Sequence, residues 1–205
     1  TTLIKMISGE LKPDQGVVML LDRKVNRLSE IARVHRGCIR SFQVSSIIGS
    51  MTVFENILLA VKQKRSILKM LFRKFQSNSS ESSFVYQILN QLSLESLGTK
   101  VASTLSHGDK RKLELAMALA MGPKILLLDE PFAGLDQAES SKLIELLKSI
   151  KKNMPILLIE HDMQAVFALA DKISVLNEGE IIESGSVEKI RRSKFVQNTY
   201  LGGDL

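Results

Sequence analysis

Short apolar runs that end in polar clusters dominate the second half of the chain. Residues 125–128 are four consecutive aliphatic side chains followed by Asp129, Glu130 and a proline, and the apolar run 155–159 is followed by Glu160 and His161. A continuous apolar run bounded in this way is typical of a strand that is buried on both faces of a parallel sheet. Segments with helical spacing separate such runs. The alternation predicts an α/β fold with a mainly parallel sheet.

The other expected elements follow from helical spacing, caps and turn residues. Helices are predicted at residues 1–8, 52–61, 83–92, 106–121 and 139–151, and further strands at residues 17–21, 39–43, 173–176 and 181–182. Thr52 with Glu55 three residues later predicts a capping box at the start of the second helix. Residues 44–122 are therefore expected to form a mostly helical lobe.

Composition narrows the class of protein. Of the 205 residues, 44% are hydrophobic and 24% are charged, which is ordinary for a globular domain and excludes wholesale disorder. No apolar run reaches the roughly 18 residues that a membrane-spanning helix needs, so we expect none. The single cysteine, Cys38, excludes a disulfide framework and fits a reducing compartment.

The formal net charge of +6 is confined to one segment. Residues 62–80 carry six basic side chains and no acidic one, which leaves 22 basic against 22 acidic residues elsewhere. Lys62, Lys69 and Arg73 lie opposite an apolar helical face, so residues 62–75 are interpreted as a basic amphipathic helix. Two interpretations stay open: a surface helix packed on the core, or a helix near anionic lipid or a membrane partner. Because the segment lacks Tyr and Trp platforms for base stacking, we expect no nucleic-acid partner.

Two sites suggest phosphate chemistry. An apolar strand that ends in Asp129 is the pattern of a magnesium-holding carboxylate in nucleotide hydrolases, although an Asp at this place is also a common helix cap. Ser106 and Gly108 stand at the start of a predicted helix, where a hydroxyl and backbone N–H groups could bind a phosphate. The alternative is a plain helix cap.

Taken in order along the chain, these motifs resemble those of the ATP-binding subunits of ABC transporters, and the resemblance extends over essentially all 205 residues. The features that carry it are the Q-loop glutamine (Gln43), the signature motif (105–109, with His107 where the commoner form has Gly), the Walker B strand (125–129), the catalytic glutamate (Glu130), the D-loop (134–136) and the switch histidine (His161). The resemblance implies a P-loop NTPase-like α/β fold with an inserted helical subdomain, and ATP with Mg²⁺ as ligands.

The resemblance also implies a role for each residue. Asp129 is expected to hold Mg²⁺ through water, Glu130 to orient or deprotonate the attacking water, and His161 to contact the γ-phosphate. Gln43 is expected to contact Mg²⁺ and the water and to couple the site to the membrane partner through the helical lobe.

Subunits of this family pair head to tail, which implies partners outside the chain. Ser106 and Gly108 are then expected to serve the nucleotide of the opposite subunit, and Asp136 to link the two sites. The implied partners are a second ABC ATPase subunit, transmembrane permease subunits and, indirectly, a periplasmic or extracellular substrate-binding protein. The implied location is the cytoplasmic face of a prokaryotic membrane.

Several segments are similar to the branched-chain amino acid import group within the family, whose relatives import urea and short amides. They are residues 41–43, the Ser-His-Gly signature, residues 160–163, residues 165–171 and the ending 200–202. The Tyr-Leu-Gly ending also occurs in the ATPase of lipopolysaccharide export, so that function stays open as an alternative.

The family's phosphate loop, G-x-x-x-x-G-K-S/T, does not occur in these 205 residues. Thr1 and Thr2 match what normally follows its lysine, which implies Thr1 as the hydroxyl ligand of Mg²⁺ and Thr2 as a phosphate contact; the alternative is two frayed terminal residues. We therefore expect one domain over residues 1–205 that lacks the family's first strands and phosphate loop. A hydrolysis-deficient fragment or assembly partner of a transporter stays open as a second function.

Overall fold

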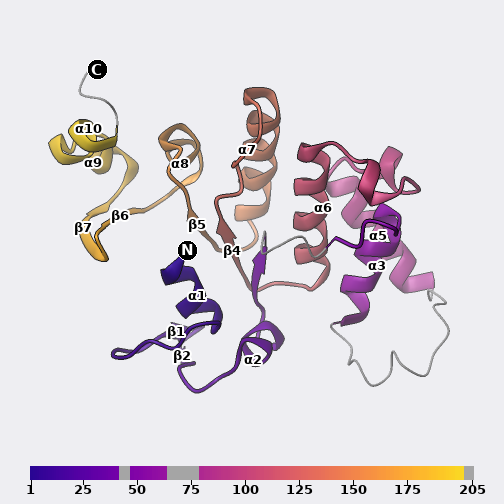
Figure 1. Ribbon diagram of the computed structural model, residues 1–205, viewed down its shortest axis with the longest axis horizontal. Helices are drawn as coiled ribbons and strands as arrows, with labels where there is room; N and C mark the ends of the chain where they lie inside the picture. The colour runs from indigo at the N-terminus through magenta and orange to yellow at the C-terminus, as the bar shows by residue number, and fades with distance from the viewer. Residues whose placement is uncertain (42–46, 64–78, 201–205) are drawn as a thin grey trace.

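The computed structural model describes residues 1–41, 47–63 and 79–200. Its elements are α1 (Thr2–Ser8), β1 (Met19–Leu20), β2 (Arg23–Lys24), α2 (Glu30–His35), β3 (Cys38–Ser41), α3 (Val53–Gln63), α5 (Ser79–Gln91), the 3-10 helices η1 (Glu95–Leu97) and η2 (Ala102–Thr104), α6 (His107–Ala120), β4 (Ile125–Asp129), α7 (Gln137–Lys151), β5 (Ile156–Ile159), α8 (Met163–Leu169), β6 (Ile173–Asn177), β7 (Glu180–Gly185), α9 (Val187–Arg191) and α10 (Lys194–Tyr200). Figure 1 shows an elongated molecule with α3, α5 and α6 at one end and β6, β7, α9 and α10 at the other.

The central sheet has the order β3-β4-β5, and both pairings are parallel, as the apolar runs predicted. Leu126, Leu127 and Leu128 of β4 are fully buried. Leu126 and Leu128 belong to the core that includes Leu143 and Leu147 of α7. Leu127 belongs to a second core on the opposite face, so β4 is covered on both faces and each leucine contributes about 2 kcal/mol by burial.

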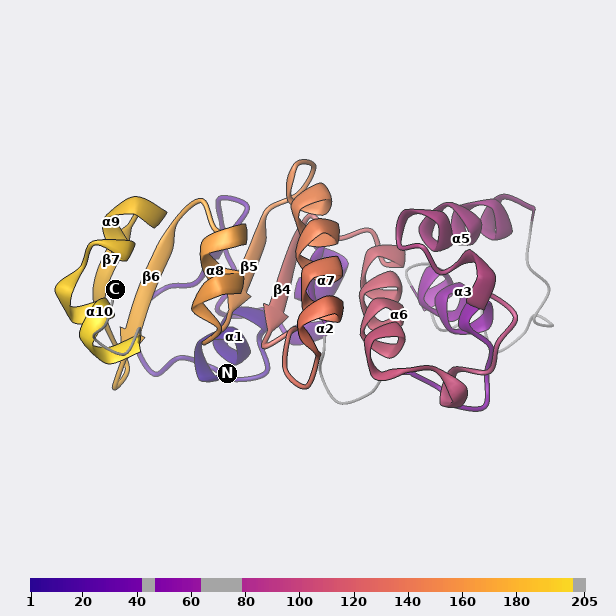
Figure 2. The same ribbon diagram turned by 90° about the horizontal axis from the view of Figure 1, so that it is seen from above.

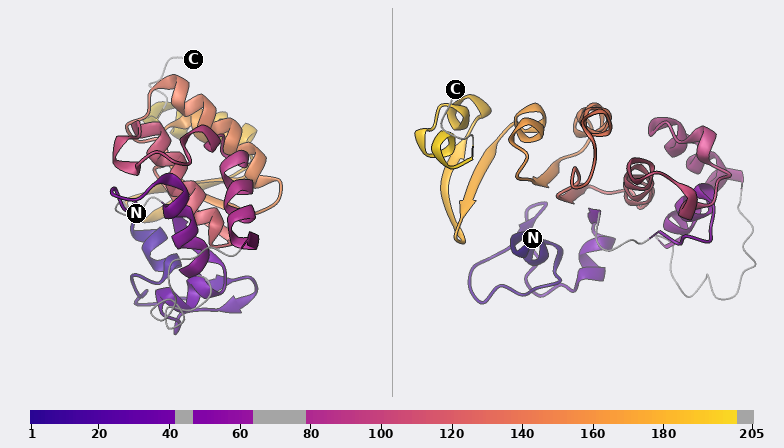
Figure 3. Two further views of the ribbon diagram at one scale, coloured as in Figure 1. Left: turned by 90° about the vertical axis from the view of Figure 1, so that its right-hand side faces the viewer. Right: turned by 45° about the horizontal axis from the view of Figure 1, so that its top comes forward.

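Helices form a layer on each face of this sheet. Figures 2 and 3 show α7 and α8 along one face and α1 and α2 on the other. The second core joins Ile4 of α1, Cys38 of β3 and Leu127 of β4. Arg33 of α2 is 1% exposed and donates to the carbonyls of Met6 and Ile7 at 2.8 Å each, which ties α2 to the last turn of α1.

The helical end of the molecule is built from α3, α5 and α6. Their apolar side chains join the larger core, which continues to β4 and α7. The predicted capping box is present, because the Thr52 N–H donates to Glu55 Oε2 at 2.8 Å and the Glu55 N–H donates to Thr52 Oγ1 at 3.2 Å. Within residues 47–63 and 79–122 the only strand-like pairing is an isolated bridge between Thr52 and Val101. The bounds of the predicted helical lobe stay a prediction.

Some element boundaries differ from the sequence-based expectation. The strand predicted at 17–21 is the two-residue β1 of a hairpin with β2, because Leu21 and Asp22 adopt positive φ in the turn. Helix α7 begins at Gln137, two residues before the predicted start, since Asp136 is its N-cap. The strands predicted at 173–176 and 181–182 pair antiparallel as β6 and β7, outside the central sheet.

Three predicted features fall outside the described residues: Gln43, most of the basic segment 62–80, and the last residues of the 200–202 ending. Among the residues that the structure describes, no helix is both long and apolar enough to cross a membrane, in agreement with the sequence.

Candidate functional site

The carboxyl ends of β4 and β5 bring the two polar clusters together. Asp129 ends β4 and is paired with Ile159 at the end of β5. The Glu130 N–H donates to the Ile159 carbonyl at 2.9 Å, which continues the pairing by one residue. Glu130 has a φ of 49°, a left-handed conformation that costs a non-glycine residue on the order of 1 kcal/mol. Ligands of parallel α/β sheets bind at this edge, so an acidic residue with a strained backbone here marks a candidate site.

Glu130 and His161, which the resemblance assigned to catalysis, lie close together. His161 Nδ1 is 3.8 Å from Glu130 Oε1, with side chains 76% and 49% exposed. Water therefore reaches both groups, and the distance leaves room for a ligand atom to approach them from the solvent side. The pair is ionic only when the imidazole is protonated.

The two carboxylate oxygens of Asp129 differ in their contacts: one has a hydrogen-bond partner and the other has none. Its Oδ2 accepts a hydrogen bond from Arg40 Nη2 at 2.9 Å, and its side chain is 10% exposed. Its Oδ1 is buried without a hydrogen-bond partner and lies 3.9 Å from the backbone nitrogen of Thr1. Thr1 is the N-cap of α1, and its hydroxyl makes no capping bond. A buried, acceptor-only oxygen of this kind suits a hard cation.

No cluster of three or more His, Cys, Asp or Glu side chains is arranged around a metal position within the described residues. A cation beside Asp129 Oδ1 therefore needs further oxygen ligands from a nucleotide or from water, which is how Mg²⁺ is usually bound in phosphate sites. Thr2 is the first residue of α1, where backbone N–H groups lack helical partners.

Sequence reasoning missed Arg40. Its side chain is 7% exposed and bridges Asp129 and Glu10, with Arg40 Nη1 donating to Glu10 Oε2 at 2.8 Å. A hydrogen bond from Lys5, whose Nζ is 3.0 Å from Glu10 Oε1, is the main cause that lowers the pKa of Glu10. The signal that could have found Arg40 is a lone charged residue in the otherwise uncharged strand β3.

Glu160 was also given no role by the sequence. Its side chain is 2% exposed and accepts hydrogen bonds from the backbone N–H groups of Phe132, His161 and Asp162. The signal was present in the polar cluster after β5, where an acidic residue precedes His161.

A second group of candidate residues lies at the start of α6. Ser106 is the N-cap: its Oγ accepts from the Asp109 N–H at 3.1 Å and donates to Asp109 Oδ2 at 2.9 Å. Gly108 is buried against α7, where a Cβ would collide with the Glu139 carboxylate. Ser106 therefore caps α6, and the residue is exposed at the protein surface.

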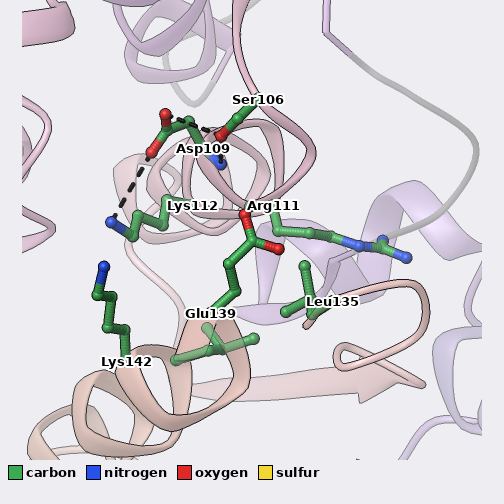
Figure 4. A pocket seen from close by; sticks show the side chains of 9 residues that line it. Ser106, Asp109, Arg111, Lys112, Leu135, Glu139 and Lys142 are labelled. Atoms are coloured by element: carbon green, nitrogen blue, oxygen red, sulfur yellow. Dashed lines mark hydrogen bonds and ion pairs between the residues drawn. The ribbon is translucent and has the colours of Figure 1, made fainter. Parts of the chain in front are cut away.

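Figure 4 shows the pocket of about 190 Å³ at this helix start, with Ser106 at its rim and Lys112 and Lys142 on one side. Lys112 Nζ lies 3.8 Å from Asp109 Oδ1. Arg111 Nη1 lies 3.3 Å from Glu114 Oε2. Burial is the main cause that raises the pKa of Glu114, and Arg111 opposes it. The pocket thus combines cations from two helices and a helix N-terminus, which suit an anionic ligand, with the carboxylates of Asp109 and Glu139.

Asp136 follows Leu135, which lines the same pocket. Its side chain accepts from the Glu139 N–H at 2.7 Å and, with Glu139, forms a capping box at the start of α7. Gly134 has a φ of 77°, and a Cβ there would lie 3.1 Å from His107 Nε2. The loop 134–136 therefore packs directly on the start of α6.

The family model for ABC transporters matches residues 1–133. The chain is 37% identical over 213 residues to the high-affinity branched-chain amino acid transport ATP-binding protein LivG of Escherichia coli (strain K12), covering 98% of this chain and 82% of LivG. It is 29% identical over 206 residues to the lipopolysaccharide export system ATP-binding protein LptB of the same strain, covering 100% of this chain and 82% of LptB.

Among solved structures, the ADP conformation of MJ1267, an ATP-binding cassette of an ABC transporter, matches with a TM-score of 0.84 at 29% identity, over 98% of this chain and 82% of that chain. The predicted α/β fold of the ATP-binding cassette type is thereby confirmed.

Proposed function

The chain belongs to the ABC transporter family, and on that premise we propose that it is the ATP-binding and hydrolysing subunit of an importer for branched-chain amino acids or related small amides. One observation supports hydrolysis most directly. Glu130 and His161 lie 3.8 Å apart, at the carboxyl ends of two neighbouring parallel strands and next to the nearly buried Asp129.

The chemistry follows from the exposure of each group. Glu130 is half exposed, so its carboxylate can orient or deprotonate a water that attacks the γ-phosphate. His161 is more exposed still and is placed to contact that phosphate. Phosphoryl transfer needs positioning and charge neutralisation more than covalent catalysis, and a carboxylate beside an imidazole at this edge can contribute to both.

Asp129 Oδ1 and the Thr1 hydroxyl would hold Mg²⁺, and Thr2 would contact a phosphate. The metal supplies charge neutralisation at the phosphates when it is bound. The buried, unpartnered Oδ1 beside Thr1 supports this assignment. Gln43, which lies outside the described residues, would contact Mg²⁺ and the attacking water.

The candidate residues form two separate groups, which supports a head-to-tail dimer. Among the described residues, no hydrogen bond or ion pair joins Ser106 or Gly108 to Asp129, Glu130 or His161. We therefore place the Ser106 pocket against the nucleotide of a second subunit, with Asp136 between the two sites.

Similarity to LivG over nearly the whole chain supports import of branched-chain amino acids. The proposed partners are transmembrane permease subunits and, through them, a substrate-binding protein, at the cytoplasmic face of a prokaryotic membrane. The similarity to LptB favours lipopolysaccharide export as a second candidate. ATP turnover of the assembled complex with leucine-loaded binding protein separates the two: stimulation supports import, and stimulation by lipopolysaccharide alone supports export.

The decisive variant is Glu130→Gln, made in the product of the whole coding region that contains this chain. ATP-driven dimerisation should persist, whereas turnover should fall by about a hundredfold or more, because the general base is lost. Glu178→Gln, at an exposed turn, is the matched control and should turn over normally. Near-normal turnover in Glu130→Gln rejects the proposed function.

The hydrolysis-deficient alternative has its own test. Equilibrium binding of labelled ATP to residues 1–205 should be weak or absent if the chain as given acts as a fragment or assembly partner, since no G-x-x-x-x-G-K-S/T loop occurs in it. Tight binding rejects that alternative.

A further inference from the structure

We propose that Glu160 is a positioning residue whose buried carboxylate fixes the loop after β4 to the loop after β5, and so sets the placement of Glu130 relative to His161. This inference rests on the proposed ATPase function, because it concerns the same site.

The carboxylate of Glu160 bridges two loops that are far apart in sequence. Its Oε1 accepts from the Phe132 N–H at 3.1 Å, two residues beyond Glu130. Its Oε2 accepts from the His161 N–H at 2.9 Å and from the Asp162 N–H at 3.2 Å. Each oxygen therefore binds a different loop: Oε1 binds two residues after Glu130, and Oε2 binds at His161 itself.

A carboxylate is the group that this bridge requires. Both of its oxygens are acceptors only, and bonds from N–H groups to an ionised acceptor are stronger than neutral ones. The Glu160 side chain is 2% exposed, and within the described ranges its only ion-pair partner is His161, whose Nδ1 lies 3.8 Å from Oε2. The three backbone N–H groups thus supply most of the stabilisation that a buried charge needs.

The same geometry places the His161 imidazole near both carboxylates. His161 Nδ1 is 3.8 Å from Glu160 Oε2 and 3.8 Å from Glu130 Oε1. The same ring nitrogen is therefore equally distant from the buried carboxylate and from the proposed general base. If the two loops shift relative to each other, the distance between His161 Nδ1 and Glu130 Oε1 changes, and the placement of water at Glu130 changes with it.

The experiment uses Glu160→Gln, with Glu145→Gln on the exposed face of α7 as the matched control. Glutamine has a single acceptor oxygen, so it cannot accept from both loops. In residues 1–205, amide hydrogen exchange should become at least about tenfold faster at Phe132, or at His161 and Asp162, than in the control. This readout does not depend on ATP hydrolysis.

Turnover is measured in the product of the whole coding region. Glu160→Gln should lower kcat by about tenfold while the Kd for ATP stays within about twofold, because Glu160 itself has no proposed contact to the nucleotide and its effect falls mainly on the placement of the general base. In the Glu130→Gln background, Glu160→Gln should cause no further loss, since the residue acts through Glu130.

Exchange rates equal to those of Glu145→Gln overturn the proposal, and so does a kcat equal to that of the control. A loss that adds fully to that of Glu130→Gln also overturns it. If Glu160→Gln does not fold, Glu160→Asp is used instead, because it shortens the side chain but keeps both oxygens. Amide exchange rates in Glu160→Asp equal to those of the control also overturn the proposal. Normal turnover of Glu130→Gln rejects the ATPase function instead and leaves the exchange result to judge the bridge.

Discussion

At the scale of single residues, Arg40 is a nearly buried cation that pairs with two carboxylates beside the site. It links the nearly buried Asp129 to Glu10, and its own side chain is 7% exposed. Arg40→Met keeps the length of the side chain but leaves Asp129 Oδ2 without its hydrogen-bond partner. Breaking a buried pair on one side costs about 3 kcal/mol of unfolding free energy, which urea denaturation measures.

Arg23→Met is the control for Arg40, because Arg23 is an exposed arginine of β2, and its cost should stay within about 0.5 kcal/mol. The double variant Arg40→Met with Asp129→Asn should be more stable than Arg40→Met alone, since no unpaired charge is left. Equal stability of Arg40→Met and Arg23→Met contradicts a stabilising role for the pair.

The buried thiol of Cys38 is expected to lower the stability of the folded chain as the pH becomes alkaline. Burial raises the pKa of its thiol from the ordinary 9.0 to about 11, and the nearby Arg33 charge opposes this only in part. The unfolded thiol therefore loses its proton at a lower pH than the folded one. Its contribution to stability is complete below about pH 9 and is lost as the pH rises toward about 11.

Cys38→Ala removes this titration. Between about pH 8 and about pH 10, the wild type should lose about 1 to 2 kcal/mol more unfolding free energy than Cys38→Ala, as measured by urea denaturation at each pH. Parallel losses in the two proteins would show that the thiol ionises equally in both states.

At the scale of elements, the sequence predicts what local pattern determines. Strand β4 was predictable, because a run of aliphatic residues covered on both faces needs no further information. Helix α2 was not, because its pattern is inverted: Ile31 is 68% exposed whereas Arg33 is 1% exposed. Arg33 is buried to satisfy two carbonyls of α1, a tertiary demand that hydrophobic periodicity does not record.

The candidate site divides in the same way. Asp129, Glu130 and His161 were identified by motif order and by the rule that polar residues follow buried strands. Arg40 was missed because its partner is 89 residues away and is set by the pairing of β3 with β4. Glu160 was missed because its partners are backbone N–H groups, whose positions depend on loop geometry rather than on residue type.

Asp136 tests whether an element's cap and a functional contact can be separated. Asp136→Ala should cost about 1 kcal/mol of unfolding free energy, because α7 loses its N-cap, whereas Asp136→Asn keeps an acceptor and should cost much less. If Asp136 links two ATP sites, Asp136→Asn should still lower turnover. Ser186→Ala removes the cap of α9 and should lower stability without affecting turnover.

At the scale of the whole molecule, one chain carries two unlike halves of a proposed site. The sheet edge offers carboxylates and His161, and the pocket at the start of α6 offers a capped helix end with cations around it. A two-fold dimer that places the sheet edge of each chain against the pocket of the other uses each surface once and forms two equivalent sites. Such an arrangement explains why the pocket is lined with groups suited to a phosphate although the proposed catalytic residues lie elsewhere.

Mixing two inactive variants tests this arrangement directly. Ser106→Asp keeps an N-cap acceptor but repels phosphate, and Glu130→Gln lacks the general base, so neither homodimer should hydrolyse ATP at a normal rate. Random mixing should restore about one quarter of wild-type turnover, because about half of the dimers are mixed and each of those has one intact site. As a control, Ser106→Asp is mixed with the double variant that carries both changes. This mixture should restore no ATP turnover, because no dimer then contains an intact site. If the two single variants also fail to complement each other, Ser106 and Glu130 act within the same chain, and the head-to-tail assignment is wrong.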